Sequence, residues 1–364
     1  GASLEDCTGC GLCSEVCPGK AGAKAIIMKA RDELKRLKKD EEYKYLFNEV
    51  SHKEDVMPTN TVKGSQFVKP KFEFSGACAG CGETPYLKLL TQLFGDKMVV
   101  ANATGCSSIF GASMPSMPYS IPWANSLFED NAEFGFGMKV ADLAMKDQIV
   151  TLIRNNIDKV KKSELDIYEA YCDEQNEENA KKLLEIIDET KIDRLTKYKD
   201  FVAPKSVWMI GGDGWAYDIG YNGIDHVLAN KLNVNILVLD TEVYSNTGGQ
   251  ASKSTRTGAV AKFAAGGKEV AKKNLAKMAL SYPHVYVGTI SLGANQMQAI
   301  KVMKEAEAYD GPSIIIAYAP CIAHGILKGM KEKDILKKLD ELLERFKISE
   351  YKDRKIKELS NFKN

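Results

Sequence analysis

The sequence lacks a run of about 18 consecutive apolar residues and a secretory signal, so we expect neither a membrane-spanning helix nor export. It also lacks an excess of charge of either sign. The chain has 50 Lys and Arg residues and 49 Asp and Glu residues, for a formal net charge of +1. Such a balance gives no bulk attraction to nucleic acid or to an anionic membrane. We therefore expect a cytoplasmic protein that binds neither.

Length and composition leave room for one large α/β domain and smaller parts. The 364 residues are 44% hydrophobic, which is enough for a substantial core. Nine cysteines in a large chain rich in Lys and Glu, without a secretory signal, do not indicate a disulfide framework. The first residue is Gly1 rather than Met and directly precedes a dense cysteine motif, so we expect a fragment or a processed product.

Four closely spaced cysteines and a proline open the chain: Cys7, Cys10, Cys13, Cys17 and Pro18. Their spacing is the C-x2-C-x2-C-x3-C-P run of bacterial ferredoxins, in which three thiolates hold one 4Fe-4S cluster and the fourth ligates the other cluster. A zinc site is the alternative, which four cysteines this close together disfavour. We expect residues 1–30 to be the C-terminal part of a two-cluster ferredoxin-like domain.

Residues 31–70 should connect this part to the rest of the chain. A charged stretch, 30–49, predicts a solvated helix, and residues 58–70, with two prolines and a glycine, predict an extended linker. Residues 71–364 then form the main domain. We expect it to carry two charged helical additions with solvated faces, a helical insertion at about 139–200 and a helical tail at about 331–364.

Two short apolar runs separated by a helix-length segment predict a βαβ unit with parallel strands. The runs are 207–210 and 236–240, and a polar cluster follows each, Gly211 to Trp215 and Thr241 to Gln250. In parallel sheets, ligands bind beyond the carboxyl ends of the strands. Both clusters should therefore face one crevice.

The chemistry of the two clusters suits a metal-bound diphosphate. Gly212 and Gly214 allow the backbone to approach a phosphate, and Asp213 supplies a hard carboxylate ligand for Mg²⁺. Neutral oxygens come from Thr241, Asn246 and a backbone carbonyl near Val243. Ordinary βα turns are also rich in Gly and Asp, but a second oxygen-rich loop after the next strand favours a cofactor site. The G-x-G-x-x-G spacing of a dinucleotide site is absent.

Further cysteines are expected on one sheet edge. Cys78 and Cys81 have C-x2-C spacing in a Gly-rich turn and can ligate a metal or a cluster. Cys106 and Cys321 each follow a predicted strand, so all four can meet. For the C-x2-C pair taken alone, zinc is the stronger interpretation. Cys172 lies in a charged helical segment and has no expected partner.

The remaining segments carry weaker signals. Residues 114–138 are rich in proline, glycine and aromatic residues with neither helical nor strand period, which predicts an ordered loop packed by its own rings. Further helices are expected at 258–265, 273–282 and 294–308, and further strands at 98–101, 284–290 and 313–318.

These motifs resemble those of the pyruvate:ferredoxin (flavodoxin) oxidoreductases. Gly212-Asp213-Gly214 looks like the thiamine-diphosphate motif, and Asp240 to Gln250, D-T-E-V-Y-S-N-T-G-G-Q, is the variant with Thr241 in place of the usual Asn. The family's C-x2-C, T-G-C-S, A-P-C and N-x-L-F-E-D-N-A-E-F-G motifs are also present. The resemblance covers nearly the whole chain and is strongest at 74–136 and 207–325.

The resemblance implies a thiamine-diphosphate-binding α/β domain with a mainly parallel sheet flanked by helices, preceded by the remnant of a bacterial-ferredoxin-like domain. It implies that Asp213, Thr241 and the Val243 carbonyl hold Mg²⁺, and that Asn246 and Cys106 lie at the reacting centre. The remaining cofactor contacts would come from Glu83, Gly212, Gly214, Trp215, Glu242, Tyr244 and Ser245. The ligands of a proximal 4Fe-4S cluster would be Cys78, Cys81, Cys106 and Cys321.

The implied reaction is the oxidative decarboxylation of pyruvate with coenzyme A to acetyl-CoA and CO2, with electrons passing through 4Fe-4S clusters to ferredoxin or flavodoxin. A related enzyme acting on a different 2-oxo acid is the alternative. Pyrimidine-binding and coenzyme A-binding parts would lie elsewhere in the enzyme, which we expect to be a homodimer. Two other classes stay open, namely a non-oxidative thiamine enzyme and a zinc-stabilised or purely electron-carrying module.

Overall fold

The computed structural model describes residues 3–19, 23–73, 75–112, 121–324, 340–341 and 344. Gly1–Gly325 form one compact unit, and Ile326–Asn364 form a second. In the second unit the described residues Asp340, Glu341 and Glu344 are helical, and the rest of the tail expected at 331–364 lies outside the described residues.

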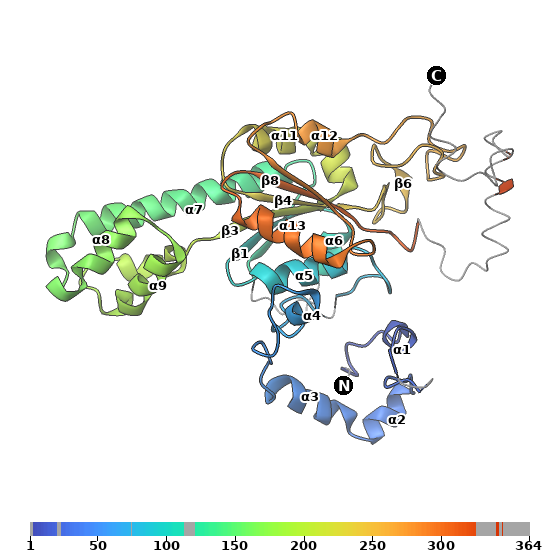
Figure 1. Cartoon of the computed structure of the whole chain (residues 1–364), viewed down its shortest axis with the longest axis horizontal. Helices are drawn as coiled ribbons and strands as arrows, with labels where there is room; N and C mark the ends of the chain where they lie inside the picture. The colour runs from blue at the N-terminus through green and yellow to red at the C-terminus, as the bar shows by residue number, and fades with distance from the viewer. Residues whose placement is uncertain are drawn as a thin grey trace. The chain divides into compact units, whose positions relative to one another are not determined.

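A six-stranded parallel sheet forms the centre of the first unit, in the order β2-β1-β3-β4-β8-β7 (Figure 1). The strands are β1 (Met98–Ala103), β2 (Trp123–Ser126), β3 (Ser206–Gly212), β4 (Asn235–Asp240), β7 (Tyr286–Ile290) and β8 (Ser313–Tyr318). The interior strands are nearly continuous apolar runs, as expected where helices cover both faces of a parallel sheet. The α/β class and the parallel sheet predicted from the sequence are confirmed.

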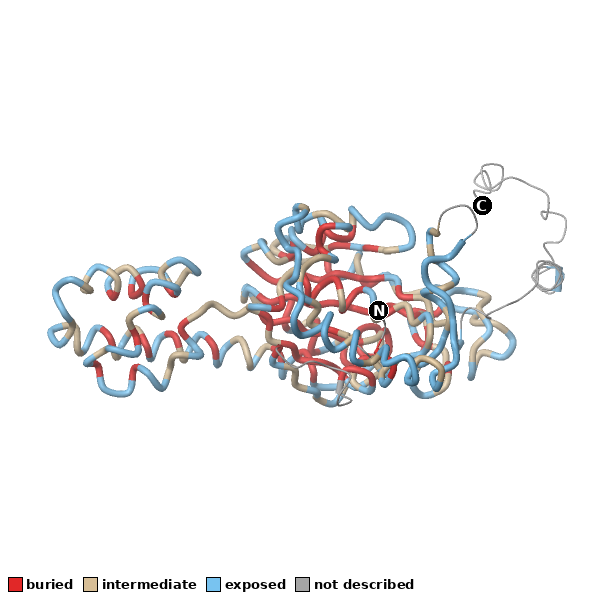
Figure 2. Tube along the Cα trace, turned by 90° about the horizontal axis from the view of Figure 1, so that it is seen from below, coloured by how far each residue is buried: buried red, intermediate tan, exposed pale blue. Residues whose placement is uncertain are grey.

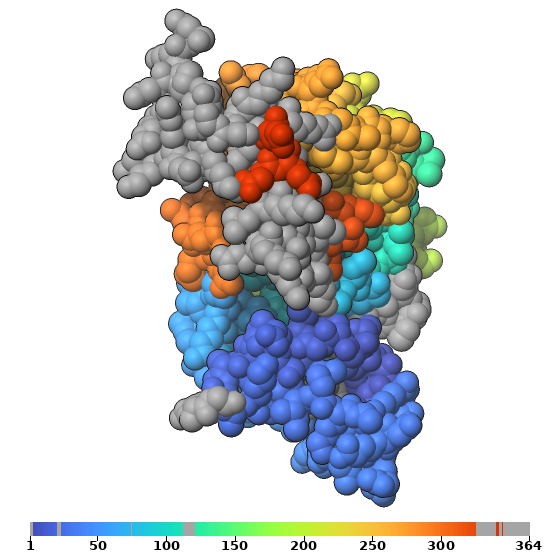
Figure 3. All heavy atoms as spheres, turned by 90° about the vertical axis from the view of Figure 1, so that its right-hand side faces the viewer, coloured from blue at the N-terminus to red at the C-terminus, as the bar shows by residue number. Residues whose placement is uncertain are grey.

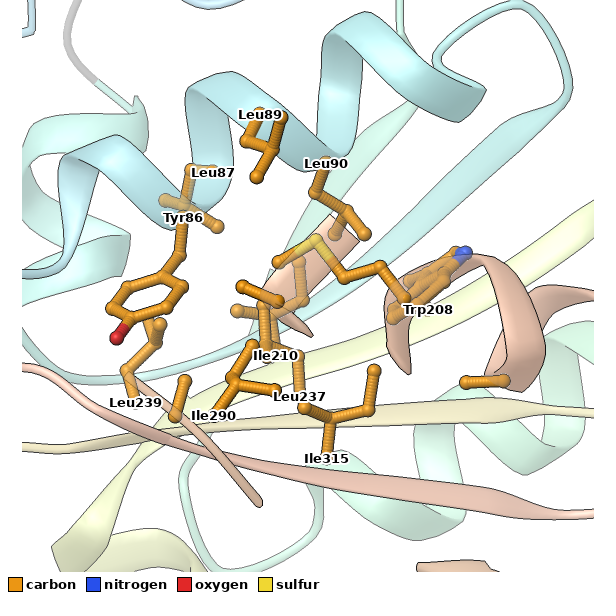
Figure 4. Close-up of a cluster of buried hydrophobic side chains, with 14 of the residues drawn as sticks. Tyr86, Leu87, Leu89, Leu90, Trp208, Ile210, Leu237, Leu239, Ile290 and Ile315 are labelled. Atoms are coloured by element: carbon orange, nitrogen blue, oxygen red, sulfur yellow. The ribbon is translucent and has the colours of Figure 1, made fainter. Parts of the chain in front are cut away.

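Helices cover both faces of the sheet. One face carries α4 (Val62–Ser65), α5 (Thr84–Phe94), α6 (Cys106–Ala112) and α13 (Gln296–Ala308), and the other carries the start of α7 (Asn131–Arg154), α11 (Tyr221–Ala229) and α12 (Leu275–Ala279). Alternate residues of β3 feed the two layers, with Trp208 and Ile210 in the first and Val207 and Met209 in the second. Figure 4 shows the first layer, where side chains of α5 pack against those of the strands.

The insertion expected at 139–200 is a helical lobe with a hydrophobic core of its own. It combines the second half of α7 with α8 (Leu165–Asp173), α9 (Glu177–Ile186), α10 (Lys199–Val202) and several 3-10 turns. Its core contains fully buried residues from all of these helices, including Ile149, Tyr168, Leu183 and Val202. Figure 2 shows buried positions in red inside the lobe. Cys172 lies in α8, as the helical segment around it predicted, and it is buried in this core, which was not predicted.

The connecting region is more structured than expected. The predicted helix at 30–49 is in fact two helices, α2 (Arg31–Arg36) and α3 (Lys39–Asn48), because Lys38 between them has φ +55° and cannot continue a right-handed helix. The predicted extended linker contains α4, whose first turn is capped by the Thr61 side chain accepting from the Gly64 amide at 3.0 Å.

The prediction of a loop at 114–138 is wrong for most of the residues in this range that the structure describes. Strand β2 occupies its middle and α7 begins at Asn131, while residues 113–120 lie outside the described residues. Glycine in this stretch does not mark a loop. A Cβ on Gly135 would lie 2.5 Å from Cγ of Met209, so this glycine lets α7 approach β3 closely.

The helix predicted at 258–265 is also wrong. Phe263 has φ +65°, which a helix does not allow, and the amides of Lys262 and Ala264 bond to Gly249 and Ala261 instead of to helical partners. The segment lies on the molecular surface, in yellow-orange in Figure 3. A short hairpin of β5 (Val243–Tyr244) and β6 (Gln250–Ala251) precedes it. The helix expected at 273–282 is limited to α12, whereas the helix expected at 294–308 is present as α13.

Among the helices of the described ranges, none is both long enough and apolar enough to cross a membrane. The N-terminal part contains one further short helix, α1 (Leu12–Glu15).

We predict that Leu237→Ala, which truncates a fully buried side chain of β4, lowers the free energy of unfolding by about 2–5 kcal/mol. The physical reason is the lost burial of the side chain together with the cavity left behind. Guanidinium unfolding followed by circular dichroism measures the change. Leu280→Ala is the control, because that side chain is 64% exposed and its loss should cost less than about 0.5 kcal/mol. Equal losses in the two variants would contradict the assigned core.

Candidate functional site

Parallel pairing brings the two predicted loops together. Gly212, at the end of β3, pairs with Leu239 of β4, so Asp213 and Thr241, the first residues after the two strands, leave the sheet side by side. Both side chains are buried, with 2% exposure at Asp213 and 8% at Thr241. After Asp213 the chain forms a π-helical turn, Gly214–Ile219, a feature that is common at functional sites.

Oxygen atoms converge around the Thr241 hydroxyl. Its Oγ1 lies 3.0 Å from Asp213 Oδ1, 2.9 Å from the Val243 carbonyl oxygen and 2.7 Å from Ser245 Oγ. A hydroxyl carries a single hydrogen and cannot donate to all of these atoms at once. A cation beside Thr241 Oγ1 would have several of these oxygens within reach as ligands, and oxygen is the ligand that Mg²⁺ prefers. The donor set therefore fits a hard divalent cation.

A cavity of about 100 Å³ adjoins these oxygens, and every cofactor-binding candidate except Glu242 lines it. Two of its glycines leave room for a ligand. A Cβ on Gly212 would meet nothing closer than the Leu239 carbonyl oxygen at 4.0 Å, and one on Gly105 nothing closer than the Ala103 carbonyl oxygen at 3.9 Å. Side chains at these positions would project into otherwise open space, so the glycines form a cradle that suits a phosphate group.

Glu242 faces away from this cavity. Its carboxylate accepts hydrogen bonds from Arg256 Nε at 2.7 Å and from Lys272 Nζ at 3.0 Å. Its backbone is left-handed, with φ +65°, and its amide donates to Asp240 Oδ1 at 3.2 Å. Glu242 thus turns the chain between Thr241 and Val243, and its side chain is not placed to contact a ligand in the cavity.

The four cysteines expected on one sheet edge meet at a second cavity of about 260 Å³. Cys78 and Cys81 precede α5, Cys106 begins α6 and Cys321 follows β8, and all of them line this cavity. None of the nine cysteines, all of which lie in the described ranges, forms a disulfide. Among the described residues, no three Cys, His, Asp or Glu side chains are close enough together to hold one metal ion. The cysteines thus surround a space larger than a single-ion site.

The two cavities share a wall. Both are lined by Glu83, Cys106, Thr241, Ser245 and Asn246. A group bound in the first cavity would therefore be separated from a group bound in the second by at most these side chains.

Burial dominates the electrostatics of the shared wall. It raises the pKa of Glu83 to about 8, helped by the nearby charge of Asp213. It also raises the pKa of Asp213 to about 7, against the lowering effect of a hydrogen bond from Ser252. Burial likewise raises the pKa of the Cys106 thiol. Within the described part of the chain, Glu83 Oε2 and Trp215 Nε1 are buried without a hydrogen-bond partner. Positive charge and polar atoms from a ligand would compensate these groups.

The N-terminal cysteines are not part of either cavity. Cys7, Cys10 and Cys13 are exposed, and Cys17 is half-buried. A backbone hydrogen bond from Ile26 lowers the pKa of the Cys17 thiol, which favours the thiolate needed for metal ligation.

Several residues of the site were missed from the sequence. Thr104 and Phe128, which line the first cavity, lie within the T-G-C-S and N-x-L-F-E-D-N-A-E-F-G motifs but were not named individually as site residues. Ser252 and Ser254, just beyond β6, donate hydrogen bonds to Asp213 Oδ2 at 2.5 Å and 3.0 Å. The available signal was the polar run S-K-S-T after the Gly-Gly turn, together with the rule that a buried carboxylate requires hydrogen-bond donors.

Two family models match this chain. Residues 197–317 match "Thiamine pyrophosphate enzyme, C-terminal TPP binding domain". These residues include β3, β4 and the loops that follow them. Residues 3–21 match "4Fe-4S binding domain", which contains the first four cysteines.

Curated relatives resemble nearly the whole chain. It is 50% identical over 359 residues to the pyruvate:ferredoxin oxidoreductase of Moorella thermoacetica, covering 92% of this chain and 30% of the relative. It is 48% identical over 344 residues to the pyruvate-flavodoxin oxidoreductase of Klebsiella pneumoniae, covering 90% and 29%, and 49% identical over 348 residues to a putative pyruvate-flavodoxin oxidoreductase of Synechocystis, covering 88% and 28%. The chain therefore spans somewhat under a third of the length of these relatives.

We predict that Gly212→Ala leaves the fold intact but weakens the binding of thiamine diphosphate at least tenfold. Space for the new methyl group exists in front of Gly212, so the cost falls on a bound phosphate rather than on the protein. Calorimetric titration with thiamine diphosphate and thermal unfolding measure the two effects. Gly137→Ala is the control, because a Cβ there also meets nothing within 4 Å and Gly137 lines neither cavity. Equal cofactor affinity in both variants would contradict the cradle.

Proposed function

We propose that this chain, whose sequence is similar to one segment of the pyruvate:ferredoxin and pyruvate-flavodoxin oxidoreductases, is the part of such an enzyme that binds thiamine diphosphate and removes the electrons from it. The reaction is the coenzyme A-dependent oxidative decarboxylation of pyruvate to acetyl-CoA and CO2, with ferredoxin or flavodoxin as the electron acceptor. The observation that supports it best is the shared wall between the two cavities.

The first cavity holds the cofactor. Asp213, Thr241 and the carbonyl oxygen of Val243 ligate Mg²⁺, and the amides around Gly212 and Gly214 bind the diphosphate. Support comes from the oxygen atoms gathered around Thr241 and from the open space in front of Gly212. Trp215, whose ring nitrogen is buried without a hydrogen-bond partner, and Tyr244, whose ring lies against Gly214, complete the enclosure.

When bound, thiamine diphosphate supplies a thiazolium ring that accepts the electron pair left by decarboxylation. The residues of the chain orient that ring and keep water away from it. Asn246 lines both cavities and presents a neutral amide to the reacting end. Glu83, with its pKa raised to about 8, holds a proton at neutral pH and can donate a hydrogen bond from Oε2.

The second cavity holds a 4Fe-4S cluster on Cys78, Cys81, Cys106 and Cys321. Cys106 matters most because it lines both cavities, so in this proposal a ligand of the cluster lies directly beside the cofactor. The match to a 4Fe-4S binding domain at residues 3–21 supports a further cluster at Cys7, Cys10 and Cys13. In a two-cluster arrangement Cys17 ligates the other cluster. Electrons would then leave the cofactor through Cys106 and reach the N-terminal clusters.

The rest of the enzyme supplies the other functions. We assign 1–30 to the ferredoxin-like part, 31–70 to the connection and 71–364 to the thiamine-diphosphate domain. The pyrimidine-binding and coenzyme A-binding parts belong to the remaining two thirds of the length that the curated relatives have. We place the complete enzyme in the cytoplasm as a homodimer.

We predict that Cys106→Ser separates the two halves of the reaction in the complete enzyme. The cluster loses a thiolate, so ferredoxin reduction should fall more than 100-fold, whereas release of CO2 from pyruvate in the first turnover should persist, because it needs only the cofactor. Rapid mixing with pyruvate, following CO2 and ferredoxin reduction separately, measures both.

Cys172→Ser is the matched control, because this cysteine lies in the core of the lobe and lines neither cavity. Visible absorption that dithionite bleaches reports whether the clusters are intact in each variant. Normal ferredoxin reduction by a Cys106→Ser enzyme shown to lack the proximal cluster would refute the proposed electron path.

We predict that Asp213→Ala abolishes the Mg²⁺-dependent binding of thiamine diphosphate, with a loss of affinity above 100-fold. Asp213 lies between two glycines at the end of a strand and contributes an oxygen to the cluster around Thr241. Calorimetric titration of the complete enzyme measures the affinity. Asp225→Ala is the control, because the Asp225 carboxylate accepts hydrogen bonds from Tyr221 and Tyr282 on the helical layer, away from the cavity. Undiminished affinity in Asp213→Ala would exclude the metal role.

A further inference from the structure

Ser252 and Ser254 are buried polar residues to which neither the motifs nor the proposed reaction assigns a role. Their exposed fractions are 5% and 0%. Both hydroxyls donate to the same atom, Asp213 Oδ2, at 2.5 Å and 3.0 Å, and the two hydroxyl oxygens lie 3.0 Å apart. Two donors converge on one carboxylate oxygen of the residue that we assign to the metal.

The two oxygens of Asp213 therefore have separate environments. Oδ1 faces the Thr241 hydroxyl at 3.0 Å, on the side where the Val243 carbonyl and the Ser245 hydroxyl also lie. Oδ2 faces the two serines. A partial rotation of the carboxylate about its Cβ–Cγ bond would break both serine hydrogen bonds, so the serines hold one oxygen on their own side and leave the other facing Thr241.

The backbone around the serines is organised to keep them in place. The hairpin of β5 and β6 reverses the chain through Gly248 and Gly249, whose φ angles are +109° and +85°. Beyond it, the Ser252 amide donates to Thr255 Oγ1 at 2.9 Å, and Lys268 Nζ donates to the Ser252 carbonyl oxygen at 2.9 Å. These bonds fix the loop, and Oδ2 of Asp213 is where both serine hydroxyls point.

Metal chemistry gives this arrangement a consequence. Ca²⁺ accepts six to eight oxygens and often takes both oxygens of one carboxylate, whereas Mg²⁺ demands near-octahedral geometry and ligands that each give one oxygen. Carboxylates that ligate metals are themselves commonly held by hydrogen bonds, and removing those partners typically costs 10- to 100-fold in metal affinity. A carboxylate whose second oxygen is occupied by two hydroxyls can give a cation only one oxygen.

We propose that Ser252 and Ser254 are positioning residues that restrict Asp213 to one-oxygen ligation through Oδ1 and thereby make the site selective for Mg²⁺ over Ca²⁺. The inference rests on the proposed function, because it assumes that Asp213 ligates the cation of thiamine diphosphate. It adds a determinant of metal choice that lies behind the ligand rather than in contact with the metal.

The test uses the complete enzyme, freed of metal and cofactor, and titrates thiamine diphosphate with MgCl2 or CaCl2 by calorimetry. In Ser252→Ala/Ser254→Ala the affinity for Mg²⁺ should fall about 10- to 100-fold. The affinity for Ca²⁺ should change less, so the Mg²⁺ to Ca²⁺ affinity ratio should fall about tenfold or more. Ser252→Thr keeps the hydroxyl and should retain the ratio of the native protein.

Ser313→Ala is the matched control. Ser313 is also fully buried and its hydroxyl donates to a backbone carbonyl, that of Ala306 at 3.0 Å, but it begins β8 at the end of the sheet opposite the site. This variant should lose thermal stability without a change in the ratio. Thermal unfolding of the metal-free variants separates a loss of structure from a loss of metal selection.

The outcomes are distinct. An unchanged ratio in the double variant, or an equal loss of both metals, overturns the inference and leaves the proposed function in place. Cofactor binding that needs no divalent cation, or that survives Asp213→Ala, refutes the proposed metal site itself. If the double variant does not fold, each single serine variant still removes one donor from Oδ2 and should give a smaller fall in the ratio. A ratio equal to that of the native protein in both folded single variants would then overturn the inference.

Discussion

The parallel hydrogen bonding between β3 and β4 is the constraint on which the site depends. It places the ends of two neighbouring strands at the same edge, so that the buried Asp213 and Thr241 meet although 28 positions separate them in the sequence. Neighbouring strands then bring Cys106 and Cys321 to the same edge, after β1 and β8. The two cavities and their shared wall are thus consequences of strand order more than of any single side chain.

The buried carboxylates at that edge differ in whether a cationic side chain accompanies them, and those without one line the site. Asp240, one residue before Thr241, is buried but satisfied by Tyr217 at 2.8 Å and by Lys272 at 2.6 Å. Asp213 and Glu83 are equally buried but have no cationic partner among the ion pairs of the described residues. Buried carboxylates without a cation are unfavourable in a low-dielectric interior, which raises the pKa of each. The protein leaves a positive charge to be supplied by a ligand.

Local sequence was sufficient for the strand-end motifs but not for contacts made across the fold. Asp213 and Thr241 could be assigned because each directly follows an apolar strand. Every strand of the main sheet except β2 was predicted, as was α13. Ser252 was missed because its role depends on a hairpin that returns the chain to Asp213. The helix predicted at 258–265 was wrong because the left-handed backbone at Phe263 is fixed by neighbouring segments and not by propensity. For the same reason the separate core of the lobe could not be predicted, since a charged amphipathic helix looks the same in a layer as in a lobe.

Helix α7 gives the lobe a mechanical connection to the sheet. Its 24 residues span about 36 Å, from close packing on β3 at Gly135 to the lobe core at Ile153. It contains no proline, and its only glycines, Gly135 and Gly137, lie at the end that touches the sheet. Bending is easiest near such residues, so a displacement of the lobe would pivot at the end of α7 that packs on the sheet. A load applied to the lobe would therefore act as torque on the strand that leads into Asp213.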